Sequence, residues 1–142
     1  MTVEPSRRYY LDTSAYLCIV LGEQGHERLS EELSGGFLCS SVLLVLEAAR
    51  NLIRLSREGD LPPADLERCL SRLAKDTDVF ALRDLTLDLC HGRTMPVVST
   101  PRSLDLAHLR TALWFHAREP LTRFVTLDNA QAQAARELGL PA

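Results

Sequence analysis

Four acidic residues in this sequence of 142 residues interrupt otherwise apolar stretches, and they are the residues best suited to chemistry. They are Asp12 in "YYLDTSAY", Glu47 in "SVLLVLEAARNLI", Asp105 in "SLDLAHLRTALWF" and Asp128 in "RFVTLD". A carboxylate buried without a partner destabilises a fold, and four that converge would repel one another strongly. A divalent cation would offset that repulsion, and an all-oxygen site suits Mg²⁺ or Mn²⁺. The sequence therefore suggests that the four side chains share a divalent metal.

Each acid also has a purely structural interpretation, which the sequence leaves open. Asp12, Asp105 and Asp128 could cap helices or lie in their first turns, which are positions that favour aspartate. Glu47 could form an ion pair with Arg50, one helical turn further along. The metal hypothesis therefore rests on the four acids taken together.

The elements that must position these acids alternate between strands and helices. Strands are predicted at 8–11, 36–41, 78–83 and 123–128. Helices are predicted at 13–21, 24–33, 41–58, 62–76, 84–91, 103–117 and 129–138, and a loop at 93–101. Strands that alternate with helices form a parallel sheet covered on both faces. We therefore expect an α/β fold, a single-domain three-layer α/β/α sandwich around a central, mainly parallel sheet of about four or five strands.

The predicted order of elements places the acids where such folds bind ligands. Ligands of parallel sheets bind in the crevice outside the carboxyl ends of the strands. Asp12 and Asp128 close two of the predicted strands, and Glu47 lies in the helix that follows a third. Asp105 lies in the first turn of its helix. Either serine at 40–41 could cap the helix that carries Glu47.

Length and composition indicate one domain over residues 1–142, with residues 1–7 as an N-terminal extension that could be flexible. No apolar run approaches the roughly 18 residues of a membrane span, and the N-terminus lacks the layout of a secretory signal. The cysteines lie among apolar neighbours without metal-binding spacing, at Cys18, Cys39, Cys69 and Cys90. We expect reduced thiols packed in the core and a cytoplasmic protein that does not enter the membrane.

The net charge of −3 argues against a surface that is basic throughout. Of 16 basic residues, all but Lys75 are arginines, whose planar groups pair well with phosphates, although high arginine usage can also reflect genome composition. Arg50, Arg54 and Arg57 follow Glu47 on one side of the same predicted helix. They could form a ridge that binds substrate phosphates, with Arg50 and Arg54 nearest the acids, or simply a solvated helix face.

The four motifs together resemble the PIN-domain family, in particular its VapC-type toxin nucleases. Such sequences open with a hydrophobic strand and D-T/S-S/N-A, here "YYLDTSA", and place a glutamate in a helix after a strand ending in serine, here "SSVLLVLEAAR". They continue with a D-x-x-H-x-x-T-A-like helix, here "SLDLAHLRTAL", and with T-x-D before a helix ending in an L-G-L-like turn, here "FVTLDNAQAQAARELGL". The resemblance extends from Tyr9 to Leu140, nearly the whole chain.

The resemblance implies a PIN-like fold and an endoribonuclease that cleaves RNA with water activated by metal. It implies one or two Mg²⁺ or Mn²⁺ ions, held by the catalytic residues Asp12, Glu47, Asp105 and Asp128. Thr13 and Ser14 would contact substrate or support the site, as could Thr126. Family members of the toxin type form homodimers and are inhibited by a cognate antitoxin, so the resemblance also implies both of these partners and a place in a type II toxin–antitoxin pair.

Two positions, Arg110 and Asn129, depart from the family's pattern, and the role of a third residue, His108, stays open. Arg110 stands where similar sequences usually carry a small residue. Asn129 follows Asp128 in place of a further acid, so the number of ligands in the last motif stays open. His108 could contact substrate or orient a ligand, or could be packed and hydrogen-bonded in the core.

Other proteins that use acid clusters on such sheets fit the sequence less well. A phosphatase of the haloacid-dehalogenase kind needs a second aspartate where this sequence has Ser14. A receiver domain needs a lysine late in the chain, and the only lysine is Lys75. No P-loop is present, because the sequence has no G-K-[ST]. The alternative that remains is a catalytically weak PIN-like module that binds RNA or acts as a scaffold.

Overall fold

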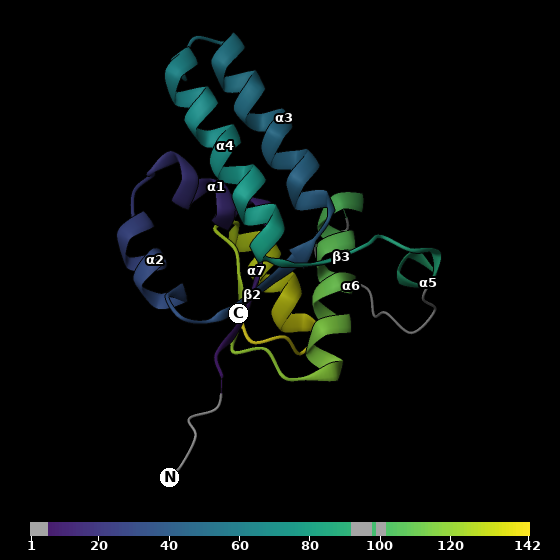
Figure 1. The fold of residues 1–142 in the computed structure, drawn as a ribbon. Coiled ribbons are helices and arrows are strands. Elements are labelled where there is room, and N and C mark those ends of the chain that lie inside the picture. The colour runs from purple at the N-terminus through teal and green to yellow at the C-terminus, as the bar shows by residue number, and fades with distance from the viewer. Residues whose placement is uncertain (1–5, 92–97, 99–101) are drawn as a thin grey trace.

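The computed structural model describes residues 6–91, 98 and 102–142, which form a layered α/β structure (Figure 1). Its strands are β1 (Arg8–Leu11), β2 (Phe37–Ser41), β3 (Ala81–Arg83) and β4 (Arg123–Val125). They form one sheet in the order β3-β2-β1-β4, in which every neighbouring pair is parallel. The predicted mainly parallel sheet is thus confirmed, as an all-parallel sheet of four strands within the described residues.

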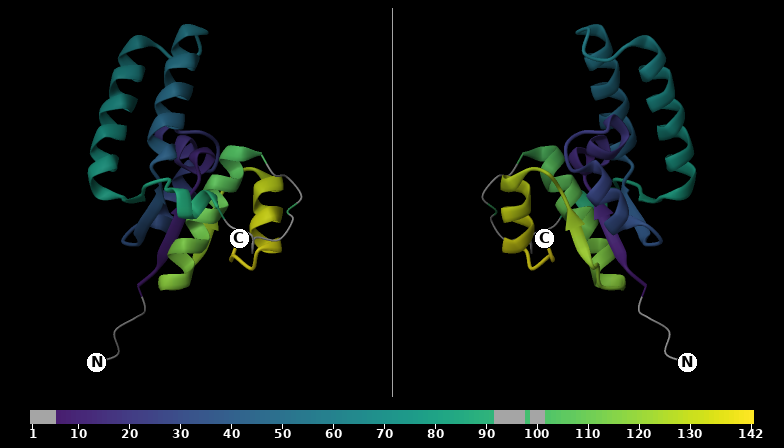
Figure 2. Two further views of the ribbon diagram at one scale, coloured as in Figure 1. Left: turned by 90° about the vertical axis from the view of Figure 1, so that its right-hand side faces the viewer. Right: turned by 90° about the vertical axis from the view of Figure 1, so that its left-hand side faces the viewer.

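Helices cover both faces of this sheet, which confirms the three-layer sandwich (Figure 2). One face carries α1 (Thr13–Leu21), α2 (His26–Leu33), α3 (Leu43–Arg57) and α4 (Pro63–Val79). The other face carries α6 (Ser103–Arg118) and α7 (Asn129–Glu137), and the short α5 (Leu87–Cys90) lies next to α6. Helices α3 and α4 form a long pair that extends beyond the sheet (Figure 1).

Alternating side chains of β1 build the two hydrophobic cores between these layers. Successive residues of a strand point to opposite faces of the sheet. Tyr9 and Leu11 therefore pack with α1–α4, whereas Tyr10 packs with α6 and α7. The Tyr10 ring stacks on Phe124 of β4 with centroids 5.3 Å apart. This packing fixes the end of β1, where Asp12 follows.

Helix α4 is longer than the sequence predicts, and the strand after it is shorter. The predicted strand 78–83 is wrong for its first residues, because α4 continues to Val79 and β3 begins only at Ala81. The hydroxyl of Thr77 donates to the carbonyl of Leu73 (2.8 Å), and the amide of Phe80 donates to the carbonyl of Asp76 (2.8 Å). These bonds continue the helix through residues whose types favour strands.

Strand β4 also ends early, at Val125 instead of the predicted residue 128. The amide of Leu127 donates to the hydroxyl of Ser14 (3.0 Å), and the amide of Asp128 donates to the hydroxyl of Thr126 (3.1 Å). Such bonds from backbone to side chain compete with the ladder of a sheet. The segment after β4 therefore turns toward the end of β1.

The remaining predictions differ in detail. The bounds of α2, α3, α6 and α7 lie within about two residues of prediction, while α5 covers only the middle of the predicted 84–91. The amide of Leu43 donates to the hydroxyl of Ser41 (3.2 Å), but the N-cap of α3 is Val42, so the prediction that a serine caps this helix was wrong. Cys18, Cys39 and Cys69 are buried as predicted, but Cys90 is exposed on α5, so its assignment to the core was wrong.

Two predicted features lie at least partly outside the described residues: most of the loop at 93–101 and the first five residues of the extension 1–7. Among the described helices, none combines the length and the apolar character that crossing a membrane requires.

Candidate active site

Four separate parts of the chain bring side chains to one hollow of about 270 Å³. These parts are the start of α1, the middle of α3, the first two turns of α6 and the N-cap of α7. The hollow is lined by Asp12, Thr13, Ser14, Leu17, Glu47, Asn51, Asp105, His108 and Asp128. We call it the acid-lined hollow. It contains all four acids singled out in the sequence, and among the described residues that line it there is neither a lysine nor an arginine.

Asp12 follows β1 directly and is the N-cap of α1. Its Oδ1 accepts hydrogen bonds from the amide of Ala15 (3.1 Å) and the hydroxyl of Ser14 (2.6 Å). Its Oδ2 accepts a hydrogen bond from the hydroxyl of Thr126. Asp12 is only 6% exposed. The capping interpretation of Asp12 is therefore confirmed, and the same side chain also lines the acid-lined hollow.

Glu47 lies in the second turn of α3 and is held through one oxygen. Its Oε1 accepts hydrogen bonds from the hydroxyl of Thr13 (2.9 Å) and from Nε2 of His108 (2.8 Å). Among the described residues no ion pair joins Glu47 to Arg50, so that alternative interpretation of Glu47 was wrong. Thr13 and His108 come from α1 and α6, and Glu47 therefore ties three helices together at the hollow.

Asp105 and Asp128 form the other side of the hollow, where α6 meets α7. Asp128 is the N-cap of α7, and its Oδ1 accepts from the amides of Ala130 (2.9 Å) and Gln131 (3.3 Å). Asp105 lies in the first turn of α6, whose N-cap is Arg102. The carbonyl of Asp105 accepts from the side-chain amide of Gln131 (3.0 Å), which holds the two helix starts together.

The pKa values of Asp105 and Asp12 are both raised in the folded chain. Burial raises the pKa of Asp105 above its ordinary value, and the negative charges of Asp128 and Asp12 raise it further, although the positive charge of Arg102 opposes this rise. Burial also raises the pKa of Asp12, although the hydrogen bond from Ser14 opposes this rise. Both shifts mean that the ionised carboxylates are disfavoured in this arrangement. A cation in the hollow would relieve that cost.

The donor set of the acid-lined hollow fits a hard divalent cation, since it offers carboxylate oxygens. Across residues 6–91, 98 and 102–142, no three His, Cys, Asp or Glu side chains already converge as a metal-binding group. Mg²⁺ usually keeps several waters and takes only one or two carboxylates, so binding does not require such a group. No described donor bonds to Oε2 of Glu47 or to the carboxylate of Asp105, and both are available.

The predicted substrate contacts Thr13 and Ser14 do line the hollow, and there they hold the acids. Thr13 donates to Glu47, and Ser14 donates to Asp12 while accepting from the amide of Leu127. Contact of either hydroxyl with a substrate stays a prediction. The structure shows both as positioning groups for the carboxylates.

The predicted arginine ridge lies outside the acid-lined hollow. A separate surface hollow of about 410 Å³ on α3 is lined by Arg50, Ile53, Arg54, Arg57 and Glu58. Arg54 pairs with Glu58 (3.1 Å) and donates to Oδ1 of Asn51 (3.1 Å). Asn51 itself lines the acid-lined hollow, so it connects the two sites.

Asn51 is a residue of the hollow that sequence reasoning missed. It follows Glu47 by four residues on α3, and its side-chain amide donates to the carbonyl of Glu47 (2.8 Å). Residues four apart on a helix share a face. That spacing from Glu47 is the signal that could have identified Asn51.

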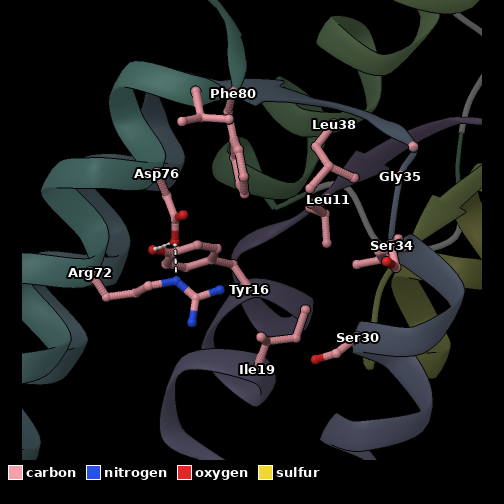
Figure 3. Close-up of a pocket in the computed structure, with 13 residues that line it drawn as sticks. Leu11, Tyr16, Ile19, Ser30, Ser34, Gly35, Leu38, Arg72, Asp76 and Phe80 are labelled. Carbon is pink, nitrogen blue, oxygen red and sulfur yellow. Dashed lines mark hydrogen bonds and ion pairs between the residues drawn. The ribbon is translucent and has the colours of Figure 1, made fainter.

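A different hollow of about 340 Å³ lies between α1, α2, β2 and the end of α4 (Figure 3). We call it the apolar hollow, because its walls include Leu11, Ile19, Leu33, Leu38, Val79 and Phe80. Its charged groups cancel one another, since Arg72 pairs with Asp76 at 2.9 Å. The hydroxyl of Tyr16 donates to the same Asp76 oxygen at 2.7 Å, and burial together with this bond raises the pKa of Tyr16. The described walls of the apolar hollow carry no uncompensated charge, so the acid-lined hollow is the candidate active site.

Comparison with known families gives one match that covers this site. The model of the PIN domain family matches residues 9–137, which include every residue that lines the acid-lined hollow. A sequence search finds no match among curated proteins.

Proposed function

We propose that this chain, which belongs to the PIN-domain family, is a metal-dependent endoribonuclease. Proteins of this family are generally nucleases. The observation that carries the proposal is the acid-lined hollow, where four segments of the chain bring together the carboxylates of Asp12, Glu47, Asp105 and Asp128. No described residue of the lining is a lysine or an arginine, and a cluster of acids of this kind favours a bound cation, which in turn favours phosphodiester hydrolysis.

The four carboxylates would hold one or two Mg²⁺ or Mn²⁺ ions beside the scissile phosphate of an RNA chain. A bound divalent cation lowers the pKa of water and offsets the charge that develops on the phosphate. In the proposed reaction water would lose a proton and form a bond to phosphorus, while the bond from phosphorus to the leaving sugar oxygen would break and that oxygen would take up a proton. The proposal needs no protein nucleophile.

The chain's own groups would keep the carboxylates ionised and correctly placed. Ser14 and Thr126 donate to Asp12, and Thr13 donates to Glu47, so each of these hydroxyls stabilises a negative charge. Hydrogen bonds of this kind fix which oxygen faces the cation. Thr13 and Ser14 also line the hollow, and we propose that their hydroxyls contact a bound substrate there.

We propose further that RNA approaches over Arg50 and Arg54. Both arginines border the surface hollow on α3 that adjoins the acid-lined hollow through Asn51. Arginine side chains bind phosphates in a bidentate manner. A single basic ridge beside an acidic site is consistent with a chain whose net charge is −3.

Beyond the chemistry, we propose that residues 1–142 form one PIN-like domain that acts in the cytoplasm as the toxin of a type II toxin–antitoxin pair. The support is the family match over residues 9–137 and the toxin-like motifs around the acids. A cognate antitoxin and a second copy of the chain would be its protein partners. Growth arrest on induced expression, relieved by the product of an adjacent small reading frame, would test this role.

One observation favours a second function, that of a catalytically weak module that binds RNA or acts as a scaffold. Asp12 and Asp128 both cap helices, and no three acids converge as a metal-binding group among the described residues. Such a module would bind RNA with the same affinity in the presence and absence of divalent metal. A ribonuclease would consume the RNA only when metal is present.

The decisive experiment compares RNA cleavage by the wild-type chain and by Asp12→Asn, with Mg²⁺ or Mn²⁺ and with chelator. Asparagine caps a helix about as well as aspartate, so this variant removes charge while keeping the cap. The matched control is Asp78→Asn, an exposed acid on α4 outside the acid-lined hollow. We expect cleavage by the wild type and the control only with metal, and none by Asp12→Asn. Equal cleavage by all three proteins would reject the proposal.

A further inference from the structure

His108 is buried, and both of its ring nitrogens have partners. The residue is 3% exposed and lies in the second turn of α6. Its Nδ1 lies 2.7 Å from the hydroxyl of Tyr10, and its Nε2 lies 2.8 Å from Oε1 of Glu47. A hydrogen-bonded chain therefore runs from the core of the sheet through the imidazole ring to a carboxylate of the acid-lined hollow.

The partners of His108 determine where its proton resides. An ionised carboxylate can only accept hydrogen bonds, so Nε2 must carry a proton to bond with Glu47. In the neutral ring Nδ1 is then an acceptor, and the hydroxyl of Tyr10 donates to it. In the charged ring both nitrogens donate, and Tyr10 accepts. The bond from Nε2 to Glu47 is the same in both forms.

Tyr10 holds the imidazole ring rigidly in place. Tyr10 is fully buried in β1, and its ring stacks on Phe124 with an interplanar angle of 6°. The Tyr10 and His108 rings meet edge to face with centroids 5.8 Å apart. The imidazole therefore has little freedom to turn away from Glu47.

We propose that His108 is a positioning residue that directs Glu47 toward the metal site, with Tyr10 fixing the orientation of the ring. His108 and Thr13 both donate to Oε1, and no donor among the described residues bonds to Oε2. Two bonds to one oxygen orient the carboxylate and leave the other oxygen for a cation or its waters. This inference rests on the proposed function, because it assigns a role within the same site.

Core packing alone does not account for this geometry. A buried histidine could satisfy one nitrogen with Tyr10 and face apolar side chains with the other. Here the second nitrogen bonds to Glu47, whose side chain is 21% exposed. Hydrogen-bonded partners of metal ligands typically contribute about 10–100-fold to metal affinity or activity. We therefore expect His108 to act on the affinity for metal as well as on stability.

The first test measures Mn²⁺ affinity by titration calorimetry for the wild type, His108→Leu and His108→Gln, together with their melting temperatures. Leucine removes the donor, whereas the side-chain amide of glutamine can donate to Glu47. We expect Mn²⁺ binding to weaken about 10–100-fold in His108→Leu and to recover most of that loss in His108→Gln. Equal Mn²⁺ affinity in the wild type and a folded His108→Leu would overturn the inference, since a purely structural histidine would change only the melting temperature.

The second test needs no variant of His108 and no metal, so it decides the inference even where His108→Leu fails to fold or the wild type binds no Mn²⁺. Imidazole ¹⁵N spectra of the chelated protein report which ring nitrogen carries a proton. We expect a protonated Nε2 on His108 whose resonance shifts in Glu47→Gln and not in Asp78→Asn. A ring protonated only at Nδ1 would overturn the inference. A wild type that binds no Mn²⁺ would count against the proposed function and against a role of His108 in metal binding, but not against the bond by which His108 orients Glu47.

Discussion

The acid-lined hollow and the apolar hollow both contain an aspartate that accepts hydrogen bonds from hydroxyl groups, but they differ in how its charge is balanced. In the apolar hollow Asp76 accepts from Tyr16 and also pairs with Arg72 (Figure 3). In the acid-lined hollow Asp12 accepts from two hydroxyls and lies among further acids, and the part of the lining that the structure describes has no arginine or lysine. The charge of Asp76 is neutralised by Arg72, and Asp76 joins α4 to α1 through Tyr16. The acids of the acid-lined hollow have no such ion pair with an arginine or lysine of the described lining, so a cation would stabilise them.

The end of β1 supplies both hollows with consecutive residues. Leu11 lines the apolar hollow and Asp12 lines the acid-lined hollow. Successive side chains of a strand point in opposite directions, so one element can serve a structural and a chemical site at once. We therefore expect substitutions in the apolar hollow to change stability and substitutions in the acid-lined hollow to change RNA cleavage.

The largest separation should come from Asp128→Asn compared with Asp76→Asn. Asparagine keeps the cap of α7 but removes a negative charge from the acid-lined hollow. We expect Asp128→Asn to lower the rate of RNA cleavage by about 100-fold or more, at or above the upper end of what lost partners of metal ligands cost. Asp76→Asn should cleave at the wild-type rate per folded molecule. Steady-state RNA cleavage under excess Mg²⁺ measures the rates of both variants. Equal losses of cleavage rate in the two variants would mean that the two hollows do not differ in their role.

Asp76→Ala should have the largest effect on stability. It leaves the buried hydroxyl of Tyr16 and the guanidinium of Arg72 without their shared acceptor. An unsatisfied buried polar group costs about 1–3 kcal/mol of unfolding free energy. Urea denaturation should show that loss, and Tyr16→Phe should recover part of it in the double variant. If the double variant is no more stable than Asp76→Ala, the unsatisfied hydroxyl of Tyr16 is not the cause of the lost stability.

Replacing Arg50 and Arg54 together by alanine should weaken substrate binding without altering the chemistry. Both arginines lie beside the acid-lined hollow and not within it. We expect KM for RNA to rise by about 3–10-fold with kcat unchanged. The slope of the logarithm of the binding constant against the logarithm of the salt concentration should become shallower by up to about 0.7 for each phosphate contact that is lost. Arg68→Ala, an exposed arginine of α4 that pairs with Asp65, is the control. Equal changes of KM in the double variant and in Arg68→Ala would mean that RNA does not bind over Arg50 and Arg54.

Asp105→Asn should produce the smallest effect, a gain in stability that depends on pH. The pKa of Asp105 is raised in the folded chain, so the ionised form is disfavoured there. Its contribution to stability is full below the unfolded pKa of about 4 and is lost as the pH rises through the folded pKa. With chelator at pH 7, Asp105→Asn should melt about 1–3 °C higher than the wild type, since partial exposure reduces the effect.

That difference in melting temperature should close below about pH 4, where both side chains are neutral. It should also close or reverse in Mg²⁺ at pH 7, because the cation stabilises only the carboxylate. Differential scanning calorimetry at the two pH values, with and without Mg²⁺, measures all of these changes. A lower melting temperature for Asp105→Asn at pH 7 in chelator would contradict the repulsion between the acids.

The sequence predicted the sheet and the placement of the acids because both follow from local patterns. Apolar runs marked the strands, and the acids at their ends, such as Asp12, marked the carboxyl edge. The strand prediction failed at 78–79, where Val79 is of a type that favours a strand. There Asp76 accepts hydrogen bonds from Tyr16 and Arg72, which hold the last turn of α4. The contact with Tyr16, which is far away in the sequence, overrides the local preference for a strand.

Partners within the site were harder to predict than its members. The sequence offered Arg50 as the partner of Glu47 because it lies nearby on the same helix. The structure instead pairs Glu47 with His108, which is 61 residues away, and with Thr13. Such pairings depend on how helices pack across the sheet, and a single sequence carries little information on that packing.

The central claim is that the acid-lined hollow holds a divalent cation, and crystals soaked in Mn²⁺ test it most directly. We expect an anomalous difference peak in the acid-lined hollow, within about 2.5 Å of carboxylate oxygens from at least one of Asp12, Glu47, Asp105 and Asp128. The peak should be lost in Asp12→Asn. A fully soaked crystal with no peak in this hollow, or with Mn²⁺ bound only elsewhere on the chain, would contradict the account.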